Sequence, residues 1–587
     1  MRDPSCSRQH PARRDPRFNL SARVLDLNVL NNEQNGRREQ GFTAWLVAAG
    51  IFLCLFGQLG AIGLTGPDEP RYAWIARTMA QTGDWVTPRL YGQPWFEKPI
   101  LYYWAAAVGF KLHFSAEWAA RLPSALAALA AAITIGWLAA KHYGGSVHSL
   151  RSPVLLAPLV FASSVAGIGF ARAATPDMLF SASIALAMAA IATVYRHSGA
   201  LRGATIAEPA RARSGYIPLL LFGAFLGLGV LAKGPAAVIM AGGAIALWTL
   251  VTKQWRAAFR AAHPIAIAAF CVVALPWYVL CAIRNPNFLK IFIWQHNFER
   301  YLTPMFHHPQ PFWFFGPIVL LALVPWTIFL WPVAREGLRS WREKSWNHSP
   351  GVFFACWAIF PVAFFSFSDS KLPSYILPAI PGLALICAVA GIRAFKESRA
   401  LAVGIAGGIG VTWIALAIGG WAFARKVSWS AVFSNYSPHD VTIGGAVGVA
   451  AAVLFTLVLL FFAMGSRIGT VAGLCALAVV LALEIANVEV LPSVDPLYSA
   501  RYHAQFMSHD LYPDRIFTYD LARSWNYGLA FYFQRQLPEW QSSDPRAALV
   551  LTNPSGLKAI EQLGRFHGQL DEPDKGILYV PVEMAPR

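Results

Sequence analysis

The run AWLVAAGIFLCLFGQLGAIGL, residues 44–64, leads directly into TGPDEPRYAWIARTMAQTGDWVTPRLYGQPWFEKPILYY, residues 65–103. The first run is apolar and long enough to cross a membrane, because a span needs about twenty such residues. The second stretch holds two acidic clusters, Asp68-Glu69 and Glu97, each beside basic or phenolic groups. Ionisable groups at a bilayer boundary are costly unless they face water, pair or serve a site. The stretch is therefore either a solvated surface loop or a functional site.

The composition of the 587-residue chain is that of an integral membrane protein. Hydrophobic residues make up 56% of it and charged residues 13%, about half the charged share of soluble domains. The net charge of +17 comes from short basic loops between apolar runs, which indicates membrane topology and anionic lipid contact rather than nucleic-acid binding. Apart from Cys6, the cysteines lie inside apolar runs, so we expect packing residues, not disulfides or a zinc site.

Thirteen apolar segments are candidates for membrane-spanning helices. They cover residues 42–64, 118–140, 152–171, 177–195, 216–232, 235–251, 264–283, 312–333, 351–367, 375–391, 401–423, 440–464 and 468–490. The loops after the even-numbered segments are basic, as expected for a chain whose N-terminus is cytoplasmic. Residues 1–40 are arginine-rich and lack a long apolar stretch, so they are predicted to be a basic cytoplasmic tail rather than a cleavable signal peptide.

The transmembrane domain is predicted to cover residues 41–490. Its first external loop, residues 65–117, is expected to hold two interfacial helices, over Arg71–Gln81 and Leu101–Phe114. The first has an amphipathic pattern, with Tyr72, Ile75, Ala76 and Met79 on its apolar face. The second is apolar but too short for a span.

Residues 491–587 have the polar patterning of a soluble domain. Strands are predicted in RIFTYD (515–520), AALVLTN (547–553), RFHGQL (565–570) and GILYVPV (576–582), and helices over 523–534 and 554–563. Strands that alternate with helices indicate a small external α/β domain. We find no glycine-rich phosphate loop or metal-ligand spacing in it.

Three acidic residues on the external side are candidates for the chemistry. Asp68 and Glu97 stand in the first loop, and Asp177 begins the fourth predicted span. A carboxylate at the membrane surface can deprotonate an acceptor hydroxyl or orient an acceptor phosphate. The structural alternatives are a helix cap at Asp68, a solvated Glu97–Lys98 pair, and stabilisation of Asp177 by the helix dipole.

Basic and aromatic residues on the same side suit a phosphate. Lys233 stands in a Lys-Gly-Pro turn, where snorkelling is the structural alternative. The segment IWQHNFERYL (293–302) supplies His296 and Arg300, and Tyr375 stands at the start of the tenth predicted span. A divalent metal held by Glu97 and His296 is a further hypothesis, although two ligands from distant loops form no metal signature.

The motifs DEPRYA (68–73) and FEKP (96–99) resemble those of glycosyltransferases that use polyprenyl-phosphate sugars, and the charged groups fit such a lipid-borne donor. A polyprenyl-phosphate sugar carries one negative charge on its phosphate, and the polyprenyl monophosphate that leaves approaches two. Cations around that phosphate therefore stabilise the transition state more than the ground state. A lipid donor also accounts for a site at the membrane boundary without a nucleotide-binding loop. Direct displacement by an acceptor opposite the leaving group would invert the anomeric carbon.

The motifs DEPRYA (68–73) and FEKP (96–99) resemble the first external loop of the GT-C superfamily of polyprenyl-phosphate-sugar-dependent glycosyltransferases. The resemblance is to the branch that holds protein mannosyltransferases and lipid A aminoarabinose transferases. It covers roughly residues 42–390 and includes TPDMLF, the Lys-Gly turn and KLPSYILPAIPG. The chain departs from some aminoarabinose transferases at His296-Asn297, since their histidine occupies the place of Asn297.

The resemblance implies a role for each candidate residue. Asp68 would activate the acceptor, with Asp177 and Glu97 as further catalytic acids. The expected contacts of the donor phosphate are Arg71, Tyr72, Lys98, Lys233, Arg300 and Tyr375. Glu97 and His296 would be the candidate metal pair, and no other cofactor is expected.

The predicted protein is a GT-C-like, all-α polytopic membrane protein with thirteen transmembrane helices and a small C-terminal α/β domain. We expect an inverting glycosyltransferase of the bacterial inner membrane, with a periplasmic site and a polyprenyl (undecaprenyl) phosphate donor. The expected acceptor is lipid A or another periplasmic glycan or lipid. The alternative enzyme is a protein O-mannosyltransferase, whose acceptor would be a protein. A lipid-glycan flippase is the alternative from another class, although the two halves show no matching broken segments.

Overall fold

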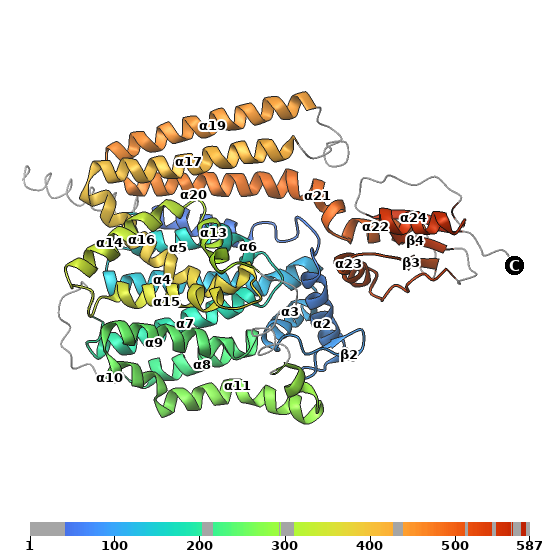
Figure 1. The fold of residues 1–587 in the computed structure, drawn as a ribbon, viewed down its shortest axis with the longest axis horizontal. Coiled ribbons are helices and arrows are strands. Elements are labelled where there is room, and N and C mark those ends of the chain that lie inside the picture. Colours follow the sequence, from blue (N-terminus) through green and yellow to red (C-terminus); the bar gives the residue numbers. More distant parts are fainter. Residues whose placement is uncertain are drawn as a thin grey trace, which may run out of the picture.

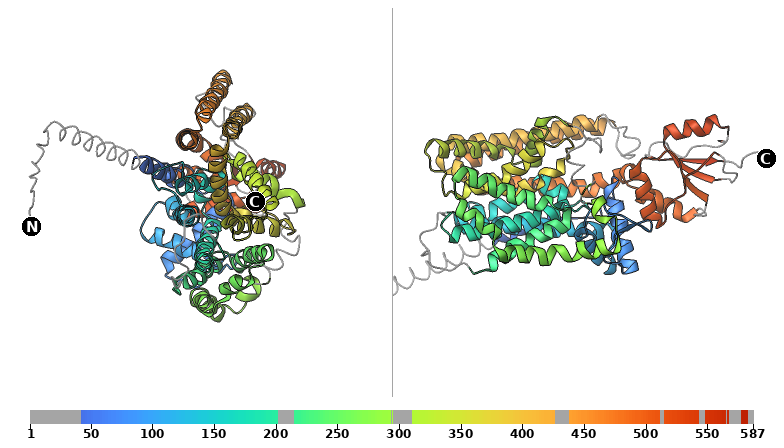
Figure 2. Two further views of the ribbon diagram at one scale, coloured as in Figure 1. Left: turned by 90° about the vertical axis from the view of Figure 1, so that its left-hand side faces the viewer. Right: turned by 60° about the horizontal axis from the view of Figure 1, so that its bottom comes forward.

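The computed structural model describes residues 42–201, 215–292, 294, 310–425, 438–510, 515–542, 548–564, 566 and 577–582. The predicted tail, residues 1–40, lies outside these ranges. The described chain forms a bundle of roughly parallel apolar helices, and a small mixed domain extends from one end of the bundle (Figure 1). The right-hand view of Figure 2 shows the same separation of bundle and domain.

Seven described helical stretches are long and apolar enough to cross a membrane, and two bent helix pairs raise this number to nine. The seven stretches comprise α4 (Ala116–Tyr143), α7 (Asp177–His197), α10 to α11 (Trp255–Arg284), η6 with α16 (Pro373–Glu397), α17 (Arg399–Ala424), most of α19 (Pro438–Met464), and α20 to α21 (Ile468–Tyr498). The bent pairs are α5 (Pro153–Ala162) with α6 (Val165–Ala171), and η4–α13 (Phe312–Ala322) with η5–α14 (Thr327–Arg342).

Four shorter apolar helices complete the described set. They are Phe42–Phe56, α8 (Ile217–Lys233), α9 (Ala236–Thr252) and α15 (Pro350–Ser366). Each of the thirteen predicted segments therefore contains an apolar helix or a bent pair. The predicted polytopic helical fold is confirmed.

Helices rich in small residues lie at the centre of the bundle. The apolar window of α7 is 89% buried, whereas that of α19 is only 11% buried. The sequence of α7, DMLFSASIALAMAAIATVYRH, is dominated by alanine and serine, which let neighbouring helices approach closely in a membrane. Helix α19 lies at the edge of the bundle beside α17 (Figure 1).

The first loop contains both expected helices. Helix α2 spans Asp68–Thr82 and α3 spans Leu101–Lys111, with a two-residue strand pair between them, β1 (Arg89–Leu90) and β2 (Gln93–Pro94). The predicted apolar face of α2 is buried against α3. The helix ends at Gly83, whose φ of 73° lies in the left-handed region that glycine adopts without strain.

The C-terminal region forms a three-stranded sheet in the order β3–β4–β5, with β3 (Ile516–Thr518) parallel and β5 (Leu578–Val582) antiparallel to β4 (Ala548–Thr552). Its helices are α22 (Arg501–Asp510), α23 (Arg523–Phe533) and α24 (Pro554–Gln562). Three of the four predicted strands are present. From the fourth, Phe566 forms an isolated bridge to Val582, and residues 565 and 567–570 lie outside the described ranges.

The last apolar helix continues past the predicted boundary at residue 490. Helix α20 (Ile468–Ile485) passes through a π-helical turn, η7 (Ala486–Val490), into α21 (Leu491–Tyr498). The first eight residues assigned to the soluble domain are thus helical and continuous with the bundle.

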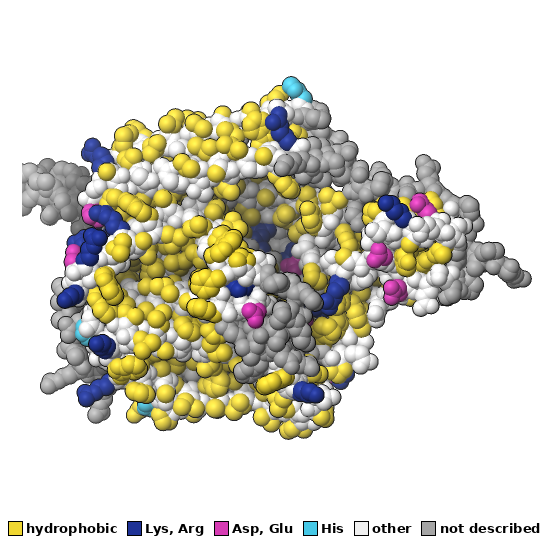
Figure 3. Space-filling model, in the orientation of Figure 1, with side chains coloured by type: hydrophobic (Ala, Val, Ile, Leu, Met, Phe, Trp, Pro, Cys, Tyr) yellow, Lys and Arg dark blue, Asp and Glu magenta, His cyan; other side chains and the backbone are white. Residues whose placement is uncertain are grey.

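Charge is distributed unevenly over the bundle. Figure 3 shows Lys and Arg side chains along the end opposite the C-terminal domain. It also shows a hollow in the apolar face nearer that domain, with charged side chains visible inside it. The candidate site lies at this second end.

Candidate active site

A buried ion pair anchors the first loop to the bundle. Glu69, in the first turn of α2, is 7% exposed, and Arg121 of α4 is 3% exposed. The Nη2 atom of Arg121 lies 2.7 Å from Oε2 of Glu69. Arg121 Nη1 also donates to the backbone carbonyls of Leu59 and Ile62, and Nη2 donates to that of Gly63. Glu69 also accepts hydrogen bonds from the backbone N–H groups of Thr65 and Ala174.

Glu69 is therefore a structural carboxylate. Burial alone would raise the pKa of Glu69, but the charge and hydrogen bonds of Arg121 and the two backbone donors hold it below its ordinary value. A carboxylate with a lowered pKa and this many donors is a poor proton acceptor. Its role is to fix the start of α2, where Asp68 stands.

Asp68, Arg71, Glu97 and Lys98 form a cluster in which acids and bases alternate. Arg71 Nη2 lies 2.5 Å from Asp68 Oδ1 and 2.9 Å from Glu97 Oε2. Lys98 Nζ lies 3.6 Å from the other Glu97 oxygen. One turn of α2 brings Asp68 and Arg71 together, and the β1–β2 hairpin leads the chain back to Glu97. The side chain of Asp68 is 52% exposed, whereas that of Arg71 is 7% exposed.

Aromatic rings surround the Arg71 guanidinium. Its carbon lies 5.2 Å from the centroid of Tyr72, 5.5 Å from Trp95 and 5.6 Å from Tyr527. Tyr527 belongs to α23 of the C-terminal domain and also stacks on Tyr91 at 6.3 Å. The C-terminal domain thus forms part of the wall of the site.

A second contact holds the C-terminal domain to α2. Arg77 Nη2 donates to the carbonyl oxygen of Phe531 at 2.9 Å, and its guanidinium lies 4.1 Å from the Phe531 ring centroid. The next residue, Tyr532, donates its hydroxyl to Glu117 at 2.8 Å and accepts from the Leu64 N–H at 2.7 Å. Helix α23 therefore contacts both α2 and the residues just before it.

Asp68 has the properties of a proton acceptor. Burial raises the pKa of Asp68 above the ordinary aspartate value, because protein surrounds its partly exposed side chain. The Arg71 guanidinium opposes this rise, and the negative charges of Glu97 and Asp177 add to it. A carboxylate that is reachable from solvent and has a raised pKa is better matched to general-base chemistry than the neighbouring Glu69.

A second cluster joins Asp177, Lys233 and Tyr375. Lys233, at the end of α8, donates to the carboxylate of Asp177 at the start of α7. The Lys233 ammonium also lies 5.3 Å from the ring centroid of Tyr375, in the 3-10 helix η6 (Pro373–Ala379). The side chains of Lys233 and Asp177 are 16% and 14% exposed, so neither is a freely solvated surface group.

The two clusters belong to one site. The charge of Asp177 is close enough to Asp68 to influence its pKa, and Lys98 interacts electrostatically with both acids. The structure thus brings together Asp68, Arg71, Glu97, Lys98, Asp177, Lys233 and Tyr375 from four separate parts of the chain. Tyr72 differs from them, since its ring is 2% exposed and packs edge-on against Tyr102 and Tyr103.

Three buried polar atoms around the first cluster have no hydrogen-bond partner among the described residues. They are Arg71 Nε, Trp95 Nε1 and the Tyr103 hydroxyl oxygen. Buried polar groups are rarely left unpaired, and each of these three can donate a hydrogen bond. Together with Lys98 and Lys233, they can receive an oxyanion.

Two predicted site residues, His296 and Arg300, lie outside the described ranges. Within those ranges, no group of three or more His, Cys, Asp or Glu side chains is arranged to hold a metal. The Glu97 carboxylate already faces Arg71 and Lys98. The described residues do not fit a metal, and the Glu97–His296 pair stays a prediction.

Sequence reasoning missed two features of the site. The Glu69–Arg121 pair had a usable signal, since Arg121 lies inside the predicted span 118–140 and an ionised residue in a span needs a buried partner. Tyr527 had none, because only the docking of α23 on α2 brings it beside Arg71.

Comparison with known proteins adds sequence relatives and a structural neighbour. The family model described as dolichyl-phosphate-mannose-protein mannosyltransferase matches residues 39–292. A protein of Sodalis glossinidius (strain morsitans), named undecaprenyl phosphate-alpha-4-amino-4-deoxy-L-arabinose arabinosyl transferase 1, is 30% identical over 417 residues, 70% of this chain and 70% of that protein. An Edwardsiella ictaluri protein of the same name without the numeral is 30% identical over 349 residues, 59% of this chain and 58% of that protein. For that relative and four others, the chain spans 57% to 63% of their length.

The fold has a close match among solved structures. The crystal structure of ArnT from Cupriavidus metallidurans bound to undecaprenyl phosphate superposes with a TM-score of 0.72 at 21% identity. The superposition covers 92% of this chain and 98% of that one. The similarity therefore includes the C-terminal domain as well as the helical bundle.

Proposed function

Because the chain belongs to the polyprenyl-phosphate-dependent sugar transferases of the GT-C superfamily, alongside the undecaprenyl phosphate-aminoarabinose arabinosyl transferases, we propose that it transfers a sugar from undecaprenyl phosphate to lipid A. The chain is a multi-pass membrane protein. The proposed reaction takes place on the periplasmic side of the bacterial inner membrane, with the N-terminus in the cytoplasm. The basic end of the bundle, opposite the site, supports this orientation.

One observation carries the proposal. Two clusters of acids and bases, from distant parts of the sequence, form a single site at one end of an apolar bundle. The cations suit a phosphate, and the apolar surroundings suit a polyprenyl chain. Asp68, the exposed acid among them, suits an acceptor that arrives from the aqueous side.

The proposed step is a direct displacement at the anomeric carbon. Asp68 accepts the proton of an acceptor hydroxyl, or orients an acceptor phosphate, while the acceptor oxygen bonds to C1 of the sugar. The bond between C1 and the donor phosphate oxygen breaks, and polyprenyl monophosphate leaves. Arg71, Lys98 and Lys233 stabilise the charge that develops on this phosphate. The product would have inverted configuration.

Asp177 acts in this proposal through Lys233. Its carboxylate already accepts a hydrogen bond from the ammonium group. The proposed step therefore does not use Asp177 as a second base. The Tyr375 ring, with its centroid 5.3 Å from the ammonium, adds a cation–π contact to this position. The pair therefore places one positive charge at a fixed point beside the leaving phosphate.

A protein hydroxyl is the second candidate acceptor. The match of residues 39–292 to the protein mannosyltransferase family favours it, and the donor chemistry would be the same. The two proposals differ only in what Asp68 activates. They are separated by finding where the sugar goes.

The test compares a deletion strain complemented with wild-type, Asp68→Asn or Glu343→Gln protein. Glu343 is the control, because it is an exposed, paired acid at the opposite end of the bundle. Mass spectrometry of lipid A should show a sugar adduct with wild type and Glu343→Gln only, and the polyprenyl-phosphate sugar should accumulate with Asp68→Asn. If lipid A is the same in all strains but the donor still accumulates with Asp68→Asn, the acceptor is a protein or another glycan. Full activity of Asp68→Asn would refute the mechanism.

Metal dependence has its own test. The purified protein, treated with a chelator and returned to metal-free buffer, should keep its transferase activity if Glu97 serves Arg71 and Lys98 only. Loss of activity that a divalent cation restores would instead support the predicted Glu97–His296 metal pair.

A further inference from the structure

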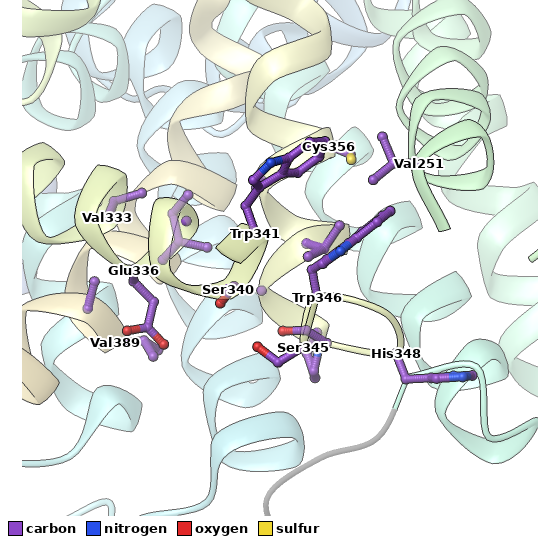
Figure 4. Close-up of a pocket in the computed structure, with 18 of the residues that line it drawn as sticks. Val251, Val333, Glu336, Ser340, Trp341, Ser345, Trp346, His348, Cys356 and Val389 are labelled. Carbon is purple, nitrogen blue, oxygen red and sulfur yellow. The ribbon is translucent and has the colours of Figure 1, made fainter. Parts of the chain in front are cut away.

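A second cavity lies at the other end of the bundle from the candidate active site. Figure 4 shows the residues that line it. Its volume is about 850 Å³, and it is walled by the end of α14, the loop after it, the first half of α15 and the ends of α4, α9 and α16. Helix α4 shows the separation, since Arg121 lies near its site end and His142 lines the cavity. The two residues are 21 positions apart along the helix, which corresponds to roughly 30 Å.

His142 points to a ligand in this cavity. The residue is 1% exposed, and neither ring nitrogen has a hydrogen-bond partner among the described residues. Its ring packs edge-on against Phe354 at 5.5 Å, which supplies no hydrogen bond. Leaving a buried polar group unpaired is costly, so a partner with both donor and acceptor groups would be favoured here.

The lining is amphipathic. In the view of Figure 4, Trp341, Trp346, Val251 and Cys356 lie in the upper part of the cavity, while the Ser340 and Ser345 hydroxyls lie below them. The two indole rings are stacked, with centroids 5.8 Å apart. Tryptophan is enriched where a membrane meets water, because its ring is apolar and its N–H is polar.

The cavity lies where the bundle faces lipid. Three apolar residues on or beside its lining helices are more than half exposed, namely Leu250 (62%), Leu338 (60%) and Ile359 (56%). Such side chains on a membrane bundle face acyl chains. A ligand can therefore enter from the bilayer itself.

The charge around the cavity is positive. Its acid Glu336 is paired with Arg393 at 2.8 Å, and Glu343 on the same helix end is paired with Arg339 at 2.9 Å. The described residues offer no ion pair to Arg342 or Lys344, which lie between Trp341 and Ser345 in the sequence. A neutral ligand would make no use of this excess.

We propose that the cavity binds one anionic phospholipid from the leaflet at this end of the bundle. The phosphate and hydroxyl groups of its head would supply partners for the buried His142 ring nitrogens and would also bond the Ser340 and Ser345 hydroxyls that line the cavity. One acyl chain would pack against the tryptophans and continue along the exposed apolar side chains. The lipid would fill the space between α14 and α15 and does not take part in the sugar transfer.

The test is native mass spectrometry of the purified full chain, titrated with phosphatidylglycerol or phosphatidylcholine of identical acyl chains. One phosphatidylglycerol molecule should bind at least about tenfold more tightly than phosphatidylcholine, since each unpaired basic side chain contributes severalfold to anionic lipid binding. Equal binding of the two lipids would overturn the proposal, as would displacement of phosphatidylglycerol by undecaprenyl phosphate.

Two variants locate the binding. Gly337→Phe should fill the cavity and abolish the preferred binding, because Gly337 lines it and has open space around its Cα atom. Gly404→Phe, at a helical glycine of α17 with equally open surroundings and outside the cavity, should bind as wild type. His142→Phe keeps an aromatic ring and should lose the preference for phosphatidylglycerol. Unchanged preference in a folded, monodisperse Gly337→Phe or His142→Phe protein would refute the assignment.

Discussion

Replacement of Glu69 by glutamine should destabilise the protein far more than the loss of one surface charge. The substitution keeps the shape but leaves the Arg121 guanidinium buried without a counter-charge. It also places an amide NH₂ group where Glu69 now accepts hydrogen bonds from Arg121 and from backbone N–H groups. Removal of one partner of a buried ion pair lowers the free energy of unfolding by about 3–5 kcal/mol. One donor left facing another accounts for about 1–3 kcal/mol of that.

The matched control is Glu397→Gln. Glu397 forms two hydrogen bonds with Arg335, but the side chains of the pair are 44% and 46% exposed. An exposed pair of this kind contributes about 0–1 kcal/mol. Unfolding of both variants by SDS in mixed micelles, followed by tryptophan fluorescence, measures the difference. Equal losses of unfolding free energy in the two variants would refute the claim that Glu69 anchors the loop.

The same pair sets a pH dependence of stability. The pKa of Glu69 is lower in the folded protein than in the unfolded chain, so its stabilisation is complete above the ordinary glutamate pKa of about 4.3. It is lost as the pH falls further, through the lowered folded pKa. Wild type should therefore lose stability steeply below about pH 4, and Glu69→Gln should lack this part of the decline.

Three further predictions concern activity. Since burial raises the pKa of Asp68, the acid limb of the rate profile should lie above the ordinary aspartate pKa of about 3.9, and a limb at or below that value would exclude Asp68 as the base. Asp177→Asn and Lys233→Met should each lower kcat by about 10²-fold or more, and the double variant should be no worse than Lys233→Met alone, whereas additive losses would show that the two act separately. Tyr527→Leu should lower kcat/KM by roughly 2- to 30-fold through loss of a cation–π contact with Arg71, Tyr527→Phe should restore most of it, and equal losses in both would refute a role for the ring.

Local pattern was enough to predict most of the fold. A membrane helix must be apolar over its length, so each of the thirteen predicted segments reappears as a helix or a bent pair. The π-helical turn at Ala486–Val490 was not predictable in this way, and the helix therefore runs beyond the expected boundary. Strand alternation predicted β3, β4 and β5 for a similar reason.

The candidate site was predictable in its residues but not in its geometry. The motifs around Asp68 and Glu97 singled out the first loop. The sequence alone did not show which of the adjacent acids, Asp68 or Glu69, is structural. Their difference depends on Arg121, because only the folded chain places its guanidinium against one acid and not the other. The part played by Tyr527 depends on tertiary docking and has no local sequence signal.

Because α23 docks on α2, the site can be completed only after the last part of the chain has been synthesised. Residues near the start of the chain, including Gly63, Leu64 and Arg77, are bonded to Asp495, Tyr532 and Phe531 near its end. The ribosome makes these partners hundreds of residues apart, so the first loop cannot form these bonds until α23 has been synthesised. A nascent or truncated chain would hold Arg71 without its third ring, and the site would be incomplete. Maturation of the site is thus tied to completion of the polypeptide.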